Sequence, residues 1–320
     1  MVVTSLWAAA GVGALVGLMV GSFLNVLIHR LPRMMELQWA REMADWQAQQ
    51  AQQAQQAQQA QQAQQAQQAQ HNGAEGAEGA ESDVPPKPSL EATPTYNLAR
   101  PGSACPACGH ALRWYENIPV LSFVGLRGRC SACGQPISWR YPVVEISTAA
   151  LFAWCLWRWG LTPTGWMWCG FSAALLSLAL IDWDTQYLPD DLTLPLLWAG
   201  LVMAALGWNP WASVHASLWG AVGGYLSLWT VYQLFKLATG KEGMGHGDFK
   251  LLAALGAWMG WPALLFLVLL ASLSGALVGV GLRLSGRMQA SQPMPFGPYL
   301  AAAGFLALLL GPTAWWPALS

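Results

Sequence analysis

GMGHGDFK, at Gly243–Lys250, places Asp248 behind three alternating glycines at the start of an apolar segment. A second acidic stretch, IDWDTQYLPD at Ile181–Asp190, closes another apolar segment and places Asp182 at its end. An ionisable side chain at membrane depth is costly, so it needs a partner or a function. We therefore interpret Asp182 and Asp248 as a functional pair.

The composition is that of a membrane protein with one polar insertion. The chain has 320 residues, of which 54% are hydrophobic and 10% are charged, whereas a soluble domain has about 25% charged residues. A net charge of −1 gives no sign of a nucleic-acid partner. The lipid bilayer is the partner that the composition predicts.

Eight apolar runs suggest an all-α polytopic membrane protein with about eight transmembrane helices. The first run is long enough to span and lacks a basic start, so we do not expect a cleavable signal. The run at Leu251–Met259 is short for a bilayer of about 30 Å. The runs are Ser5–Ile28, Val143–Trp159, Thr164–Ile181, Leu192–Gly207, Val214–Phe235, Leu251–Met259, Ala263–Leu284 and Phe296–Leu310.

The distribution of basic residues predicts which membrane face the acids occupy. If the polar insertion is cytoplasmic, every Lys and Arg except Arg158 falls on the cytoplasmic side, as the positive-inside rule requires. The third run then ends, and the sixth begins, at that same face. Asp182 and Asp248 are far apart in the sequence but are expected to meet there.

The insertion divides into a low-complexity part and a cysteine-containing part. We predict a first transmembrane helix at 1–33, a Gln/Ala-rich insertion at 34–98, a metal-binding module at 99–142 and a seven-helix membrane domain at 143–320. Ala-Gln-Gln triplets at Ala48–Gln70 have no apolar face, so we favour a mobile or fraying segment over a protruding helix. Gly-Ala-Glu repeats at Gly73–Glu81 and the proline-rich Val84–Pro88 are typical of linkers.

Two C-x-x-C pairs indicate a metal site in the module. Their spacing is close to that of paired zinc knuckles, and disulfides are rare in the cytoplasm. Four thiolates leave no open position, so the zinc ion would be structural. Redox pairs or another metal remain alternatives, and Cys155 and Cys169 suit apolar packing. The candidate ligands are Cys105, Cys108, Cys130 and Cys133.

Two neighbouring carboxyl groups share a proton, so one can accept a proton from water while the other donates to a carbonyl oxygen. This chemistry predicts an aspartyl peptidase. Other nearby polar residues have simpler interpretations. We expect Asp190 or Asp191 to cap a helix and His246 to be a loop residue, with Lys250 a charge partner for the acid pair or a headgroup anchor.

Two other functions, a transporter and a membrane scaffold, are alternatives to the peptidase. A transporter can use intramembrane acids to move protons or cations, but it should place them within spans and show inverted repeats. A scaffold with a zinc module and inert acids leaves the spacing of Gly245, Gly247 and Asp248 unexplained.

In combination, the motifs resemble the type IV prepilin peptidases, which are GxGD-type membrane aspartyl proteases and bifunctional N-methyltransferases. The resemblance covers the chain except about 35–98, where the Gln-rich insertion departs from the family. It extends to Trp114–Pro119, to Arg140-Tyr141-Pro142 with Glu145, and to an Asp followed by Leu-Pro-Asp. The quoted motifs begin with GSFLNV at Gly21–Val26 and HRLP at His29–Pro32.

The resemblance implies that Asp182 and Asp248 are catalytic and that the four cysteines bind Zn²⁺. It implies that the enzyme cleaves type IV prepilins or type II secretion pseudopilins after a glycine, on the cytoplasmic face of the bacterial inner membrane. It also implies methylation of the new N-terminal residue, usually Phe, by S-adenosylmethionine. No glycine-rich fingerprint locates the methyl-donor site, so its residues are unknown.

Overall fold

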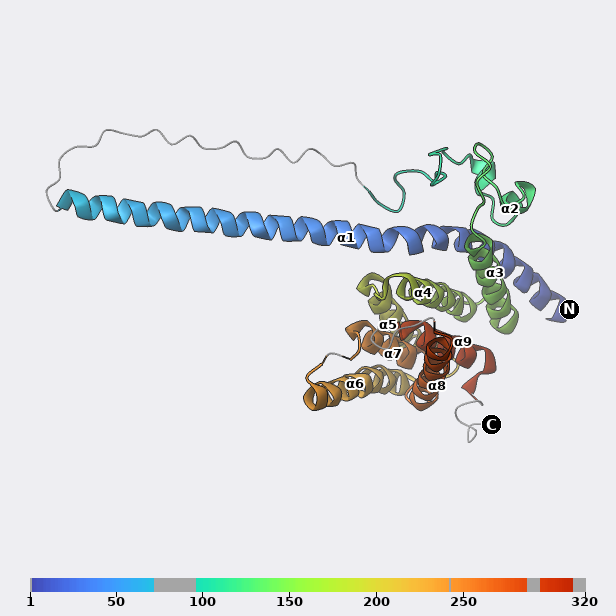
Figure 1. Cartoon of the computed structure of the whole chain (residues 1–320). Helices are drawn as coiled ribbons and strands as arrows, with labels where there is room; N and C mark the ends of the chain where they lie inside the picture. The colour runs from blue at the N-terminus through green and yellow to red at the C-terminus, as the bar shows by residue number, and fades with distance from the viewer. Residues whose placement is uncertain (1, 72–95, 242, 287–293, 313–320) are drawn as a thin grey trace. The chain divides into compact units, whose positions relative to one another are not determined.

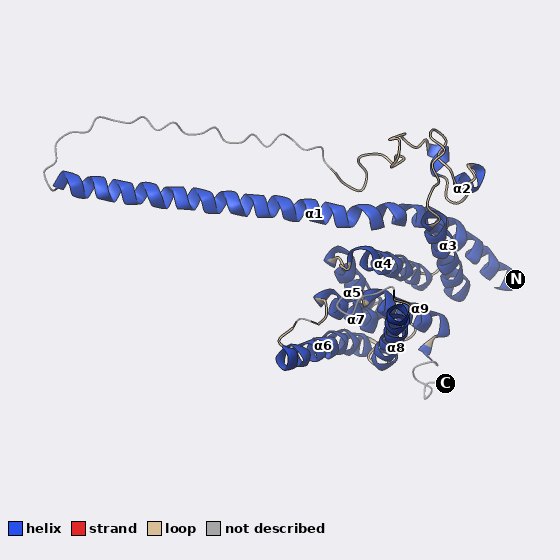
Figure 2. Cartoon of the chain, viewed as in Figure 1, coloured by secondary structure: helices blue, strands red, loops and turns tan. Residues whose placement is uncertain are grey.

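The structure is a computed structural model that describes residues 2–71, 96–241, 243–286 and 294–312. In these residues the regular secondary structure is helical (Figure 2). The Gly-Ala-Glu repeats and the proline-rich segment that we predicted as linkers lie outside the described residues. The elements are α1 (Val2–His71), η1 (Trp114–Asn117), α2 (Leu121–Gly125), α3 (Arg140–Trp159), α4 (Pro163–Thr185), α5 (Asp190–Ala205), α6 (Val214–Thr239), α7 (His246–Met259), α8 (Ala263–Leu284) and α9 (Gly297–Leu310).

The chain forms two compact units. One comprises Met1–Pro32 and Gly102–Ser320, and the other is Arg33–Pro101. The first unit contains the helices α2–α9, the four cysteines and both aspartates of interest. The finer division into four domains stays a prediction.

The long helix α1 differs from one of our expectations. It includes Pro32 (Figure 1). It continues through the Ala-Gln-Gln triplets, where we favoured a mobile or fraying segment. Ala and Gln are strong helix formers, and extending an existing helix is much easier than starting one. An apolar face is therefore not required for this segment to be helical.

Each of the eight apolar runs coincides with a helix, α1 or one of α3–α9, to within two residues at the ends of α5 and α9. This confirms the all-helical prediction for the described residues. Three helical stretches are long and apolar enough to cross a membrane, and α9 is a shorter apolar helix. The three are Ser5–Gln65 within α1, α4 and α8. The number of eight membrane crossings stays a prediction.

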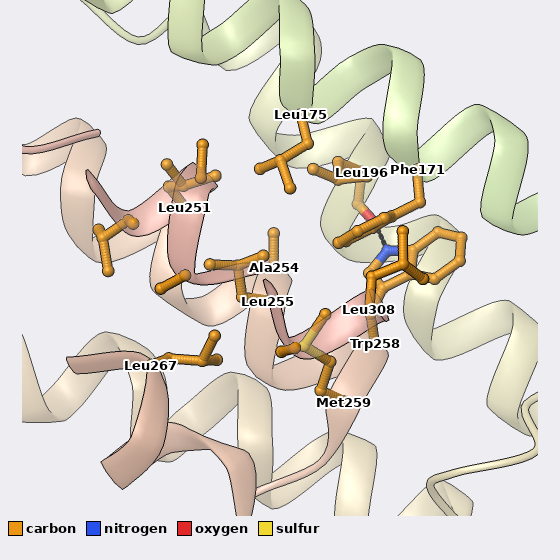
Figure 3. Packing of buried hydrophobic residues seen from close by; sticks show 14 of the residues in the cluster. Phe171, Leu175, Leu196, Leu251, Ala254, Leu255, Trp258, Met259, Leu267 and Leu308 are labelled. Carbon is orange, nitrogen blue, oxygen red and sulfur yellow. Dashed lines mark hydrogen bonds between the residues drawn. The ribbon is translucent and has the colours of Figure 1, made fainter. Parts of the chain in front are cut away.

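Helix α7 forms the centre of the first unit. From Leu251 to Met259 every residue is buried, and α5, α6, α8 and α9 all pack against the helix. In Figure 3 its side chains meet those of Phe171 and Leu175 on α4 and Leu308 on α9. The Trp258 indole donates a hydrogen bond to the Leu196 carbonyl at 2.7 Å, which satisfies its buried N–H. The short apolar run is thus a core helix rather than one that faces solvent or lipid.

Close approach of α6 to α7 requires glycine. A Cβ on Gly220 would collide with the carbonyl of Gly256, and one on Gly224 would lie 2.7 Å from the carbonyl oxygen of Leu252. Small residues allow helix backbones to pack at this distance. The packing holds the first turn of α7, which carries Asp248, within the bundle.

Candidate active site and four-cysteine site

Asp182 lies in the last turns of α4, and its side chain is buried with the residue only 4% exposed. Gln186 ends the helix in the left-handed conformation, with φ 55°, and donates its N–H to the Asp182 carbonyl at 2.8 Å. The left-handed residue reverses the chain direction. The segment after α4 is thereby turned back toward the acid.

Asp248 lies in the first turn of α7 and is 7% exposed. Gly245 is the N-cap of this helix, and the helix begins at His246. A helix N-terminus carries partial positive charge and favours a carboxylate. The glycine-rich stretch therefore places the acid at the electrostatically favourable end of a buried helix.

Leu188 connects the surroundings of the two acids. Its side chain is buried in the loop between α4 and α5, where it packs against Gly247 and Gly297. A Cβ on Gly247 would lie 2.7 Å from Leu188, and a Cβ on Gly297 would lie 2.6 Å from Asp182 Oδ2. One leucine thus touches the glycine preceding Asp248 and the glycine that contacts Asp182. The two carboxyl groups are close enough to interact electrostatically.

The Asp182 carboxyl group is only partly satisfied by its surroundings. The backbone of Gly297 forms a hydrogen bond with it, but among the residues that the structure describes no partner meets hydrogen-bond geometry at the buried Oδ2. A buried polar atom without a partner is unfavourable unless a ligand, a water molecule or a proton satisfies it. Paired carboxyl groups with a free oxygen can bind a water molecule and exchange protons with it.

Asp190 and Lys250 form an ion pair beside this site. The Lys250 ammonium donates to both Asp190 oxygens, at 2.6 and 2.7 Å. Pro189 is the N-cap of α5, and Asp190 lies in the first turn, so the expected aspartate cap is wrong. Because the helix begins one residue earlier than expected, Asp190 and Asp191 both lie in its first turn, and Asp190 binds Lys250 instead.

Two further polar residues have structural partners. The Arg140 guanidinium binds Asp184 through two contacts, at 2.8 and 2.7 Å, and so joins the start of α3 to the end of α4. His246 is exposed at the first position of α7, and its ring packs against Tyr232 with centroids 5.2 Å apart. It is therefore a helix-terminal residue rather than part of a loop.

The four cysteines come together in two similar turns. In each pair the following glycine has positive φ and donates its N–H to the carbonyl of the first cysteine. The ligand atoms of all four lie within 4.8 Å of one another. A tetrahedral zinc–thiolate site has sulfur atoms about 3.8 Å apart. The cluster can therefore hold a metal ion after a small contraction. These residues are Cys105, Cys108, Cys130 and Cys133.

Glu116 links the two cysteine turns from within the module. Its carboxylate accepts hydrogen bonds from the Arg113 N–H at 2.8 Å and the Ser131 hydroxyl at 2.6 Å, and His110 lies 3.4 Å away. The Ser131 hydroxyl, with the Arg113 N–H, lowers the pKa of Glu116. Charge-assisted bonds of this kind prearrange the two turns around one point. The backbone N–H groups of Cys108 and Ala107 likewise lower the pKa of the Cys105 thiol to about 7.

Sequence reasoning gave no role to Leu188 or Gly297 individually. Gly297 stands between Phe296 and Pro298 at the start of an apolar run, which could have suggested a helix N-terminus. Its contact with Asp182 depends on tertiary packing and has no local signal.

The fold and the two acids define a class, a helical protein with several apolar helices of membrane-spanning length and two buried carboxyl groups at helix ends. Comparison with known families then narrows the class. Residues 15–159 match the bacterial peptidase A24 N-terminal domain, and residues 169–280 match the type IV leader peptidase family. The chain belongs to this family of type IV prepilin leader peptidases, peptidase family A24.

Several curated relatives extend over nearly the whole chain. A prepilin leader peptidase/N-methyltransferase of Pseudomonas aeruginosa is 47% identical over 93% of this chain and 89% of its own length. Relatives with the same name from Burkholderia pseudomallei and Aeromonas salmonicida are 46% and 44% identical, over 92% and 95% of this chain and 83% and 92% of their own lengths. No solved structure matches the chain.

Proposed function

We propose that this chain is a prepilin leader peptidase and N-methyltransferase in which Asp182 and Asp248 form the peptidase site. The observation that carries the site assignment is the contact of Leu188 with both Gly247 and Gly297, which brings the two acid-bearing segments together. Family membership supplies the activity, and it displaces the transporter and scaffold alternatives.

The reaction needs no covalent intermediate. One carboxylate removes a proton from a bound water molecule, and the water oxygen attacks the carbonyl carbon of the scissile peptide bond. The other carboxyl group, protonated, donates a hydrogen bond to the carbonyl oxygen as it gains negative charge. Transfer of a proton to the amide nitrogen then breaks the C–N bond. The buried Asp182 carboxyl group, whose Oδ2 lacks a hydrogen bond of good geometry, supports a position for the water or the carbonyl beside it.

We assign the substrate class and the methyltransferase activity from the resemblance to the family. The substrates are type IV prepilins or type II secretion pseudopilins, cleaved after a glycine at the cytoplasmic face of the bacterial inner membrane. S-adenosylmethionine then supplies a methyl group to the new N-terminal residue, usually Phe. The apolar helices support the membrane location.

A cleavage assay tests the enzyme class. We expect the purified wild type in detergent to release the leader from a prepilin peptide, and labelled S-adenosylmethionine to label the shortened peptide. Failure of the wild type to cleave a panel of prepilins and pseudopilins would contradict the proposed function.

Zinc is the metal that four closely spaced thiolates favour. We expect Cys105→Ser to reduce bound zinc to near zero, because a structural site needs all four ligands. Elemental analysis of the purified protein measures this. Cys155→Ser, which alters a buried cysteine outside the cluster, is the matched control. An unchanged zinc content in Cys105→Ser would contradict the assignment of the four cysteines as a zinc site.

A further inference from the structure

Glu145 is a buried acid for which the peptidase mechanism has no use. It lies in the second turn of α3 and is 7% exposed. Its Oε2 accepts the backbone N–H of Val120 at 2.7 Å, across 25 residues of sequence. The Ser22 side chain also forms a hydrogen bond with this carboxyl group. Glu145, on α3, therefore contacts two other segments: α1 and the start of α2.

Val120 is held in a conformation that a β-branched residue rarely adopts. It is the N-cap of α2, with φ 58° and ψ −45°. Positive φ is unfavourable for valine, so the surroundings must stabilise it. The turns on either side bond to other backbone groups: Leu121 donates to Pro119, and Ser122 donates to Ile118. The Val120 N–H itself is satisfied by Glu145.

The position of Glu145 is fixed by close packing of α1 on α3. A Cβ on Gly21 would lie 2.7 Å from the Glu145 Cα, and one on Gly17 would lie 2.6 Å from the Ala149 Cα. Asn25 adds a hydrogen bond from its side chain to the Tyr141 carbonyl at 3.2 Å. The carboxylate thus projects from a rigid two-helix support toward the segment that follows the first cysteine turn.

The same end of α3 is tied to the helix that bears Asp182. Arg140, at the first position of α3, binds the Asp184 carboxylate and approaches the Leu180 carbonyl at 3.4 Å. Both partners lie within two residues of Asp182 on α4. A module held on Glu145 is therefore fixed at the end of the bundle where the acid lies.

We propose that Glu145 is a positioning residue that docks the four-cysteine module onto α1 and α3 through the Val120 N–H, so that the module forms part of the substrate-binding surface beside the acid pair. The docking contact stands on the geometry alone, whereas its effect on substrate binding rests on the proposed function. Glu145 touches neither substrate nor the reacting atoms in this role.

Amide hydrogen exchange measures the docking contact without any substrate. We expect the Val120 amide to be protected in the full-length wild type and to exchange at least about tenfold faster in Glu145→Leu, because the leucine removes a charge-assisted acceptor. Glu145→Gln should restore most of the protection, since its amide oxygen can accept the N–H and its amide nitrogen can bind Ser22. Glu36→Leu, the same change at an exposed position of α1, is the control.

Cleavage kinetics measure the consequence. We expect KM for a prepilin peptide to rise about tenfold in Glu145→Leu, with kcat within about twofold of wild type because the acid pair is untouched. Glu145→Gln should return KM toward the wild-type value.

The two measurements separate failure of this inference from failure of the proposed function. An unprotected Val120 amide in the wild type, or equal protection in all variants, overturns the docking contact. Faster exchange with an unchanged KM overturns the part played in substrate binding. A wild type that cleaves no prepilin contradicts the proposed function, while hydrogen exchange still decides the docking. If Glu145→Leu does not fold, Glu145→Asp replaces it, because its shorter side chain cannot reach the Val120 N–H; protection in Glu145→Asp equal to that in the wild type then overturns the docking contact.

Discussion

Single glycines and one leucine set the geometry of the acid pair. Gly297 has no room for a side chain, because Asp182 Oδ2 occupies the space that a Cβ would need. Leu188 lies between Gly247, which precedes Asp248 in the sequence, and Gly297, which contacts Asp182 in space. Glycines at these positions leave the space that the Asp182 carboxyl group and the Leu188 side chain occupy.

Gly297→Ala tests this at the residue scale. We expect cleavage to fall by about 100-fold, because a misplacement of about 1 Å at a catalytic group has an effect of that size. The protein should still insert and fold. Gly170→Ala is the matched control, since a Cβ at this α4 glycine meets nothing within 4 Å. Cleavage by Gly297→Ala at the rate of that control would show that the contact with Asp182 is unimportant.

The two acids could be predicted from the sequence, but the residues that position them could not. The sequence pointed to Asp182 and Asp248 because both are acids at the ends of apolar runs, and the structure brings their surroundings together. Leu188, Gly297 and the link from Glu145 to Val120 were not predicted. Their contacts join segments distant in sequence, so no local pattern records them.

At the scale of helices, an ion pair joins the starts of α5 and α7. Lys250 follows Asp248 by two residues, and its partner Asp190 follows Leu188 by two. The Lys250 and Asp190 side chains are 30% and 47% exposed, so solvent screens their attraction. The pair nevertheless joins the segment that follows Leu188 to the first turn of α7.

A double-mutant cycle measures this pair. We expect Lys250→Met and Asp190→Asn to lower the free energy of unfolding with a coupling of about 1 kcal/mol, the upper end for an exposed pair. The double variant should be little worse than either single variant, in stability and in cleavage. Strictly additive effects, measured by unfolding in detergent, would show that the two residues act independently.

Helix positions followed from the sequence better than helix ends and environments. Apolar runs located each of the helices α1 and α3–α9, because burial in a bundle or in lipid requires apolar residues. They did not show that α7 is enclosed by other helices, since a buried helix and a lipid-facing helix have the same composition. The predicted end of α1 was also wrong. The helix extends through the Ala-Gln-Gln triplets because Ala and Gln favour helix even where no core packs against them.

At the scale of the whole molecule, the chain separates an exposed low-complexity part from the part that holds the sites. The Ala-Gln-Gln helix is exposed wherever its side chains are described. The other unit contains the acid pair, the cysteines and Glu145. This division predicts that the Gln-rich part is dispensable for catalysis.

Deletion of Ala48–Gln65, which removes whole triplets, tests that prediction. We expect cleavage within about twofold of wild type, because the removed residues are exposed and belong to the unit without the acids and cysteines. Prepilin cleavage in membranes, normalised to the amount of inserted protein, is the measurement. A well-inserted deletion variant without activity would show that the segment contributes to substrate binding or catalysis.

Asp182 and Asp248 are proposed to act together as the peptidase site. The most direct measurement compares leader cleavage by wild type, Asp182→Asn and Asp248→Asn, with methylation of an already cleaved peptide measured in parallel as the test of intact structure. We expect each asparagine variant to lose cleavage by about 1,000-fold or more and still to methylate the cleaved peptide. Cleavage by either variant at the wild-type rate would contradict the proposal.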